Sequence, residues 1–476
     1  MWEKVLAKIA AGERFAGLHG TAHADGLVLT AHVVTDDDVE MIDADAGTPP
    51  DAYPALTPAL RAAFWYEREI HDLFGVVPEG HPWLDPLLLP GALLPRPGDG
   101  TMPAGSDPDE HAVPRHVTGP GLFTIPHGPV RSGVFESVEY LVETPGEDIP
   151  HLSVRPFYKH RGIEKRFEGM PAGDGVLLAE RVEGVASVAH ALAYCHAIER
   201  LTGCTPPWPA RLVRVLHAEL ERVANHLDVA VKLCDAAGLA VATARFAWHK
   251  ERVLRLVGRL CGSRFGRGVV IPGGVGRLPD GTGLLAEVGT LEKDVARDAR
   301  LLMDTSSFLD RLRGTGPLTP ERAREHGALG PVGKASGLID DARANRPYDA
   351  YEALGMGPAA RHDHGDALAR LQVRWEEITE SFRLLRQVID ELSDARGPAS
   401  VPVPEIDGRA VGWAEAPQGE VLYEVCLAGG VITRCRPRSA SFHNLALFHD
   451  VFAGDILTDF PFIEASFGLS IAGVAR

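Results

Sequence analysis

The cysteines give the first chemical information in this sequence, because thiolates bind soft metals and form redox-active disulfides. They are Cys195, Cys204, Cys234, Cys261, Cys426 and Cys435. No two of them are three residues apart, so the chain has no C-x-x-C pair for a zinc ribbon, a thioredoxin-type site or a ferredoxin-type cluster. Six cysteines in 476 residues are also too few for a disulfide scaffold, which favours a reducing compartment.

A row of ionisable residues is the second candidate for chemistry. Glu219, Arg222 and His226 lie at i, i+3 and i+7 in a helix expected over 208–236, on one flank of its apolar stripe. They form either a half-buried structural ion network or a row that handles protons. The residues expected on the solvent face of the same helix are Arg214, Glu221 and Asp228.

Other classes of function are disfavoured by what the sequence lacks. It contains no G-x-x-x-x-G-K-[ST], G-x-S-x-G or H-E-x-x-H motif, and the glycine-rich stretch 272–276 is expected to be a turn. A formal charge of −17, from 48 basic and 65 acidic residues, argues against a nucleic-acid partner. No apolar run is long enough to span a bilayer, and the first residues lack the apolar core of a secretory signal.

The elements that position these residues follow from the patterning. Residues 1–90 predict a small α/β unit with a strand over 27–34 and a helix over 57–75, capped by Thr57 and stopped by Gly75. Many Pro and Gly residues over 91–120 predict a linker. Further helices are expected over 181–203, 208–236, 240–261, 283–313 and 365–394, then strands over 408–440 and a final helix and tail over 441–476.

Several segments resemble one known family. Residues 66–75 (YEREIHDLFG), followed by Gly-His-Pro at 80–82, resemble the signature of the 30 kDa (C-type) subunit of respiratory complex I. Residues 160–165 (HRGIEK) are similar to the HRGxEK motif of the 49 kDa (D-type) subunit and of the large subunits of membrane-bound nickel–iron hydrogenases. Residues 180–194 parallel the hydrogenase segment R-x-C-G-x-C-x-x-A-H, and 272–275 match the family's I-G-G-V turn.

The order of these segments is that of the fused, formate-hydrogenlyase-type large subunits. The resemblance implies an α+β fold: a hydrogenase large-subunit-like helical bundle with small flanking sheets over 121–476, preceded by the α/β domain. It implies a peripheral subunit on the cytoplasmic face of the membrane, in a complex I-like or hydrogenase-4-like oxidoreductase that works in electron transport. The expected partners are an iron–sulfur small subunit, which carries the cluster, and integral-membrane subunits; NAD and quinone are the substrates associated with such complexes.

The metal-binding cysteines of the family are missing here. Hydrogenases of this type bind nickel and iron through two C-x-x-C pairs, because soft thiolates suit these metals. By resemblance, the first pair falls on Glu183 and Ala186, and the second on Ser470 and Gly473. We therefore expect no nickel–iron centre, and no cofactor of its own, in this chain.

The family's quinone ligands are replaced as well. The tyrosine that holds the quinone headgroup falls on Gly184, and the histidine falls on Ser132. A further histidine near the terminal iron–sulfur cluster falls on Gly266. Arg131, beside Ser132, could still offer a hydrogen-bond donor at the family's quinone-site turn.

The remaining candidates belong to the environment of the partner's cluster. By resemblance, Arg181 lies near that cluster, where a cation would raise its reduction potential. Glu183 is interpreted as a proton carrier or as a partner of Arg181 or a neighbour. The other candidates, either an interdomain ion-pair network or redox-tuning groups, are His160, Arg161, Glu164 and Lys165. His190 and Tyr194, one helical turn apart, are expected to face the core.

Three functions stay open at this point. The first is a subunit that supports electron transfer without its own metal centre. The second is a catalytically inert structural or assembly subunit. The third is a quinone-reducing subunit with an atypical pocket built from Arg131, Arg181 and Glu183.

Overall fold

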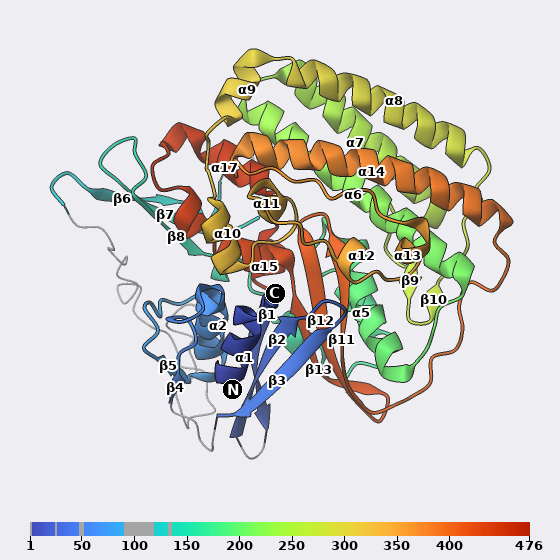
Figure 1. The fold of residues 1–476 in the computed structure, drawn as a ribbon, viewed down its shortest axis with the longest axis horizontal. Helices are drawn as coiled ribbons and strands as arrows, with labels where there is room; N and C mark the ends of the chain where they lie inside the picture. Colours follow the sequence, from blue (N-terminus) through green and yellow to red (C-terminus); the bar gives the residue numbers. More distant parts are fainter. Residues whose placement is uncertain (1, 24–25, 47–51, 90–118, 132–135) are drawn as a thin grey trace.

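Long helices and small sheets occupy different parts of the molecule (Figure 1). The computed structural model describes residues 2–23, 26–46, 52–89, 119–131 and 136–476. The long helices lie together at the top of the view, and the blue and orange sheets lie below them. This mixture of helices and small, mainly antiparallel sheets is the α+β fold that the sequence predicts.

The N-terminal part contains a three-stranded antiparallel sheet, a two-stranded parallel sheet of β4 and β5, and two helices. Its elements are α1 (Trp2–Ala10), β1 (Arg14–His23), β2 (Gly26–Val34), β3 (Val39–Asp45), β4 (Ala52–Pro54), α2 (Phe64–Phe74) and β5 (Val77–Glu79). Strands β1, β2 and β3 pair in that order, and α2 packs on β1. The strand predicted over 27–34 is β2, within one residue.

The start of α2 differs from the prediction. The helix begins at Phe64, after a 3-10 turn over Arg61–Ala63, and Thr57 does not cap it. Instead, the Thr57 hydroxyl donates a hydrogen bond of 2.6 Å to the buried carboxylate of Glu67, in the first turn of the helix. The predicted end is confirmed, because Gly75 closes the helix in the left-handed conformation (φ 70°).

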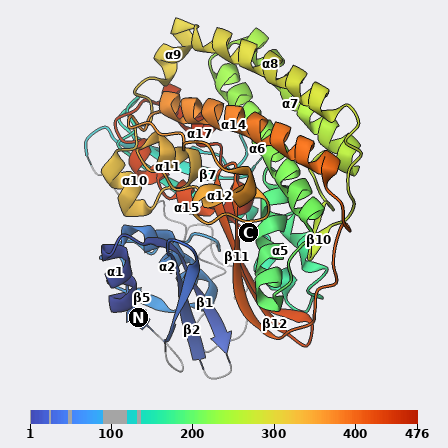
Figure 2. The ribbon, with the colours of Figure 1, turned by 45° about the vertical axis from the view of Figure 1, so that its right-hand side comes forward.

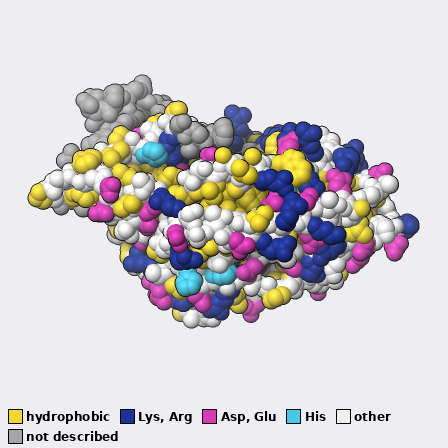
Figure 3. Space-filling model, turned by 90° about the horizontal axis from the view of Figure 1, so that it is seen from above, with side chains coloured by type: hydrophobic (Ala, Val, Ile, Leu, Met, Phe, Trp, Pro, Cys, Tyr) yellow, Lys and Arg dark blue, Asp and Glu magenta, His cyan; other side chains and the backbone are white. Residues whose placement is uncertain are grey.

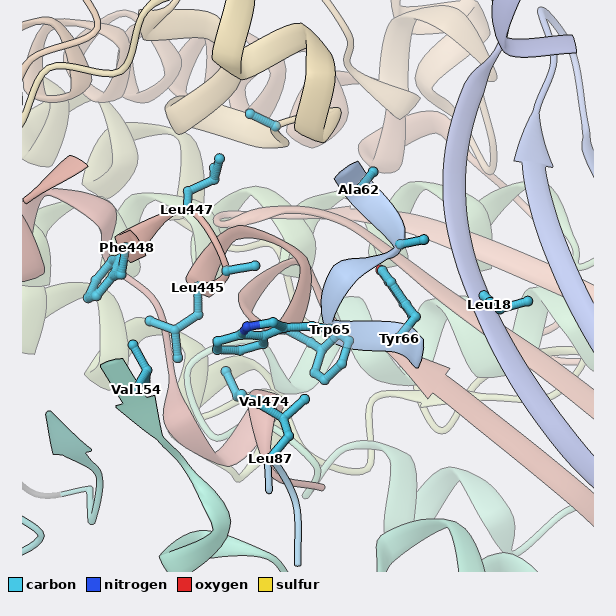
Figure 4. Close-up of a cluster of buried hydrophobic side chains, with 14 of the residues drawn as sticks. Leu18, Ala62, Trp65, Tyr66, Leu87, Val154, Leu445, Leu447, Phe448 and Val474 are labelled. Atoms are coloured by element: carbon cyan, nitrogen blue, oxygen red, sulfur yellow. The ribbon is translucent and has the colours of Figure 1, made fainter. Parts of the chain in front are cut away.

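One apolar cluster joins the N-terminal part to the end of the chain (Figure 4). Trp65 of α2 is 1% exposed and lies among Leu445, Val474 and Leu87. Its ring meets that of Phe442 edge-on, with centroids 5.8 Å apart. The division of the chain at 91–120 stays a prediction, and nearly all of that linker lies outside the described residues.

A second sheet and three short or medium helices follow in the sequence. They are β6 (Phe123–His127), β7 (Glu139–Thr144), β8 (His151–Arg155), α3 (Ile163–Phe167), α4 (Gly175–Ala179) and α5 (Ser187–Thr202). The helix predicted over 181–203 therefore begins later, at Ser187. The residues between α4 and α5 form a turn instead of the first part of the predicted helix.

The long helices form the upper layer of the molecule (Figures 1 and 2). They are α6 (Trp208–Ala236), α7 (Ala240–Cys261), α8 (Leu284–Met303) and α14 (Ala367–Asp394). Helix α6 packs against both α7 and α14, through the apolar stripe that the sequence shows. The helix predicted over 283–313 is interrupted, because α9 (Ser306–Leu312) starts separately after Thr305.

Short elements connect these helices. They are β9 (Val270–Ile271), β10 (Gly274–Val275), α10 (Pro320–His326), α11 (Gly330–Ala335), α12 (Ala342–Asn345) and α13 (Tyr351–Leu354). Strands β9 and β10 pair as a hairpin around Pro272 and Gly273, which confirms the predicted turn.

The C-terminal part begins with a three-stranded antiparallel sheet packed on α5. Its strands are β11 (Gly408–Ala416), β12 (Gly419–Ala428) and β13 (Val431–Arg438). Four short helices follow, instead of the predicted single helix and tail: α15 (Ala440–Leu445), α16 (Phe448–Val451), α17 (Phe460–Phe467) and α18 (Ile471–Val474). At Gly412, a Cβ would clash with the backbone of α5, so glycine permits the close contact between β11 and this helix.

Among the described residues, no helix combines the length and apolar character needed to cross a bilayer. Seen from above, acidic and basic side chains are interspersed with apolar ones (Figure 3). Some of these opposite charges form ion pairs between α7 and α8, such as Arg252–Asp294 at 2.8 Å.

Candidate functional site

Glu183 lies at the centre of a buried polar cluster. It stands in the turn between α4 and α5, and only 1% of its surface is exposed. Its Oε2 is 3.2 Å from His190 Nε2, and its Oε1 accepts a hydrogen bond of 2.7 Å from the Ser441 hydroxyl. His190 Nδ1 lies 2.8 Å from the hydroxyl of Tyr423. A carboxylate, held from two other segments of the chain, thus occupies a position that the family pattern gives to a thiolate.

Two of the other positions that lack cysteines, Ser470 and Gly473, lie at this carboxylate, and Ala186 is linked to Glu183 through the backbone. A Cβ on Gly473 would clash with Glu183 Oε2, so the carboxylate fills the space beside the glycine. The Ser470 amide donates a hydrogen bond of 3.1 Å to the Ser441 hydroxyl, which in turn donates to Glu183. The Ala186 amide donates to the Glu183 carbonyl at 3.2 Å.

These residues do not fit a nickel–iron centre. None of the four positions carries a thiol, and the soft metals of that centre require thiolate ligands. The only ionisable group among them is the Glu183 carboxylate, and its two oxygens are already engaged by His190 and Ser441.

A second carboxylate, Glu136, secures the C-terminal side of the cluster. The Ser470 hydroxyl donates to Glu136 at 2.9 Å, and the Ala472 amide donates to it at 3.3 Å. Arg161 closes the cluster from the other side, because its Nη2 donates to the carbonyls of Val182 (2.6 Å) and Ala472 (2.8 Å). Arg161 therefore ties the turn before α5 to helix α18.

Local sequence patterns do not predict which residues surround Glu183. Ser441 lies 258 positions away in the chain, and Tyr423 lies 233 positions from His190. The only local signal is Ser439, whose hydroxyl caps α15 by accepting from the Phe442 amide at 3.0 Å. That signal predicts the helix start, but it does not predict the partner of Ser441.

Arg181 points away from Glu183. Its side chain is 49% exposed, and its Nη1 contacts the Glu180 carboxylate and the Leu177 carbonyl. Of the two pairings expected for Glu183, the one with Arg181 is therefore wrong and the one with a neighbour is confirmed, since Glu183 pairs with His190. A half-exposed cation is left at the edge of the turn that carries the buried carboxylate.

Glu164 belongs to an ion-pair network between the N-terminal part and the C-terminal sheet. Burial would raise its pKa, but the guanidinium groups of Arg436, Arg434 and Arg476 outweigh burial and lower the pKa to about 2. Arg436 and Arg476 also bind Glu69 of α2, at 3.0 and 2.9 Å. These contacts favour the structural interpretation of Glu164.

The neighbours of Glu164 make separate contacts. Burial lowers the pKa of His160, so its ring is neutral at pH 7. Lys165 is exposed and pairs with Glu168 at 2.5 Å. Of the HRGIEK segment, Arg161 is thus the residue in direct contact with the turn that carries Glu183.

Arg131 lies apart from the Glu183 cluster. It forms a two-pronged ion pair with Glu464, at 2.9 and 2.7 Å, over the ring of Tyr140. In the described part of the chain, Arg131 therefore contacts Glu464 and Tyr140 rather than Glu183 or Arg181. Ser132 lies outside the described residues.

Gly184 and Gly266 line one pocket at the surface. Other residues of its wall are Val188, His217, Glu221 and Phe265. A Cβ on Gly184 would meet nothing within 4 Å. The two positions at which the family pattern has a tyrosine and a histidine therefore face a shared, mostly apolar hollow.

Glu221 is one of two acidic residues that line this pocket, and Asp228 is the other. The Glu221 carboxylate accepts hydrogen bonds from the amides of Val188 (2.8 Å) and Ala189 (3.1 Å) at the start of α5. Burial outweighs these bonds and raises its pKa to about 8. The predicted solvent-facing position is wrong, because the side chain lies half-buried against α5.

The α6 row is also more deeply buried than predicted. Glu219, Arg222 and His226 are inaccessible to solvent, and His226 Nε2 lies 2.7 Å from Glu377 of α14. The three residues thus join a buried structural ion network.

Arg214 of α6, predicted on the solvent face, is fully buried. Its Nη2 lies 2.6 Å from Glu199 and its Nη1 lies 3.2 Å from Asp349. The Arg214 charge is therefore buried by partners from other segments of the chain. Asp228, also predicted on the solvent face, is half-buried and binds Lys250 at 2.7 Å.

Titration of Glu221 predicts a change of stability with pH. The pKa of about 8 lies above the unfolded value of about 4.5, so the folded state loses stability as pH rises from about 5 to 8. We expect Glu221→Gln to flatten this loss in urea unfolding measured at pH 5 and pH 8. The exposed Glu352→Gln variant is the control, and an equal pH slope in wild type and Glu221→Gln would contradict the assignment.

Comparison with known proteins places the chain in one family. Residues 6–103 match the model of the respiratory-chain NADH dehydrogenase 30 kDa subunit, and residues 238–407 match that of the 49 kDa subunit. Formate hydrogenlyase subunit 5 of Escherichia coli (strain K12) is 30% identical, over 89% of this chain and 77% of its own. The carbon monoxide-induced hydrogenase of Rhodospirillum rubrum is 31% identical, over 74% of this chain and 99% of its own.

A solved structure shows the same fold. A chain of the membrane-bound sulfane sulfur reductase, an archaeal respiratory membrane complex, superposes with a TM-score of 0.70 and 26% identity. The match covers 75% of this chain and 99% of that one. This chain therefore belongs to the family of the complex I 30 kDa and 49 kDa subunits and the related large subunits of membrane-bound hydrogenases.

Proposed function

We propose that this chain is a peripheral subunit of a membrane-associated, complex I-like or hydrogenase-4-like oxidoreductase, on the cytoplasmic face of the membrane. It supports electron transfer beside an iron–sulfur small subunit and binds no nickel–iron centre itself. The relatives, subunits of membrane-bound hydrogenase and complex I-like assemblies, support the general role. The hydrogen-bonded cluster around Glu183 is the observation that supports the absence of a nickel–iron centre.

The cluster supports a role without a metal because its groups are already satisfied. Glu183 accepts from Ser441 and pairs with His190, while Ser470 donates to Glu136. We therefore keep Glu183, which lies beside His190, as the candidate proton carrier of this cluster.

The surface beside the cluster supports docking of the iron–sulfur partner. Arg181 is half exposed, and the pocket lined by Gly184 and Gly266 opens next to it along the same turn. A partner that covers this surface would bring its cluster within reach of the Arg181 charge. A quinone pocket built from Arg131, Arg181 and Glu183 is less well supported, because the three side chains have different partners. Arg131 pairs with Glu464, Arg181 with Glu180, and Glu183 with His190.

Replacing Arg181 in the assembled complex tests the tuning role. We expect Arg181→Ala to lower the reduction potential of the nearest cluster, because removal of a cation disfavours the reduced form. Redox titration followed by electron paramagnetic resonance measures the potential, and substrate turnover is recorded with it. Arg300→Ala, an exposed arginine on α8, is the matched control.

The outcome separates two of the functions. Unchanged potential and turnover in Arg181→Ala, with the complex intact, would contradict the tuning role and favour an inert assembly subunit. A lowered potential in Arg181→Ala but not in Arg300→Ala would support the role proposed here.

A further inference from the structure

A trio of buried side chains joins the N-terminal sheet to the C-terminal sheet. His19 comes from β1, His32 from the neighbouring β2 and Glu424 from β12. The blue and orange sheets that carry them lie side by side in both ribbon views (Figures 1 and 2). Each of the three residues is at most 3% exposed.

The three side chains converge on one point. His19 Nε2 is 2.9 Å and His32 Nε2 is 2.7 Å from the same oxygen, Oε2 of Glu424. Each residue offers one potential metal-ligand atom, and these three atoms lie within 4.8 Å of one another. Two imidazoles and a carboxylate are a common zinc ligand set, with the fourth position left to water or another group.

The nearby positive charges are already neutralised. Arg409 approaches the other carboxylate oxygen, Oε1, at 3.6 Å, and it is held by Asp43 at 2.6 Å. Arg436, whose charge acts on His32, is bound by Glu69 and Glu164. The Oε2 side of Glu424 therefore faces two imidazole rings rather than an unpaired cation.

We propose that His19, His32 and Glu424 bind one Zn²⁺ ion that fastens the N-terminal sheet to the C-terminal sheet. In the absence of metal, both Nε2 atoms must carry a hydrogen to bond with a single carboxylate oxygen. In its presence, both nitrogen lone pairs and the carboxylate point at the ion. This structural site is separate from the Glu183 cluster and does not depend on the function proposed above.

Zinc titration of the full-length chain tests the proposal. The chelator-treated protein is titrated with Zn²⁺ against a chromophoric chelator, and the thermal unfolding midpoint is measured with and without one equivalent of Zn²⁺. We expect one tight equivalent and a raised midpoint for wild type. The variants His32→Gln and Glu424→Gln should bind Zn²⁺ at least about tenfold more weakly.

His23→Gln is the matched control, because His23 is exposed at the end of the same strand β1. It should behave as wild type. Absence of a stoichiometric Zn²⁺ equivalent in wild type, or equal affinity in wild type and both site variants, would overturn the proposal.

Cobalt provides a readout that needs no variant, in case His32→Gln or Glu424→Gln fails to fold. We expect wild type with one equivalent of Co²⁺ to show the intense visible bands of a four-coordinate site, which disappear on addition of Zn²⁺. Only the weak spectrum of hydrated Co²⁺ would overturn the proposal.

Discussion

Replacing Arg343 with methionine is expected to lower the free energy of unfolding by about 3–5 kcal/mol. The guanidinium is 2% exposed and lies 3.0 Å from Glu219 and 2.8 Å from Asp341. Methionine fills a similar volume but leaves these two carboxylates buried without their main counter-charge. Urea unfolding followed by circular dichroism measures the loss.

Two further variants show whether the ion network is the cause. Arg313→Met removes a cation that is 60% exposed and pairs with the exposed Asp310, so its effect should be at most about 1 kcal/mol. The double variant Arg343→Met/Glu219→Gln should recover part of the stability, because it removes one of the unpaired charges. Equal effects of Arg343→Met and Arg313→Met would contradict the structure of the network.

Trp65→Ala is expected to produce a loss of similar size, about 3–5 kcal/mol, by opening a cavity in the shared core. The indole ring lies between the N-terminal α2 and the C-terminal residues Leu445 and Val474 (Figure 4). Its removal should therefore expose the N-terminal part to limited proteolysis as well as lower the unfolding midpoint.

Trp248→Ala is the control for that experiment. Trp248 is 48% exposed on α7 and contacts Arg252, whose charged carbon lies 4.6 Å from the ring. We expect about 1 kcal/mol or less from this truncation. If the N-terminal part of Trp65→Ala resists limited proteolysis as well as that of wild type, the result would contradict the shared core.

Local patterning predicted the long elements well. Helices α6 and α7 have the bounds that apolar spacing and flanking residues indicate, and β11, β12 and β13 fall within 408–440. The order of motifs also predicted the family that the comparisons show. Errors begin where short-range signals conflict, as at Thr57, which binds a glutamate instead of capping a helix.

The candidate site depends on contacts that local patterning does not encode. The sequence identified Glu183, Gly473 and Ser470 as positions that have lost their thiols, but it gave no reason to place Ser441 between them. Arg214 was predicted to face solvent because charge on a helix face normally does. Burial by Glu199 and Asp349 reverses that expectation, and both partners come from other segments.

The metal content of the native complex tests the central claim most directly. The complex should be purified anaerobically through a tag on this chain, and its nickel and iron should be quantified by mass spectrometry beside a nickel–iron hydrogenase prepared in parallel. We predict iron from the partner's cluster and no stoichiometric nickel, because a carboxylate fills the space beside Gly473 and no thiol is present at the four positions. One nickel per chain would contradict the account.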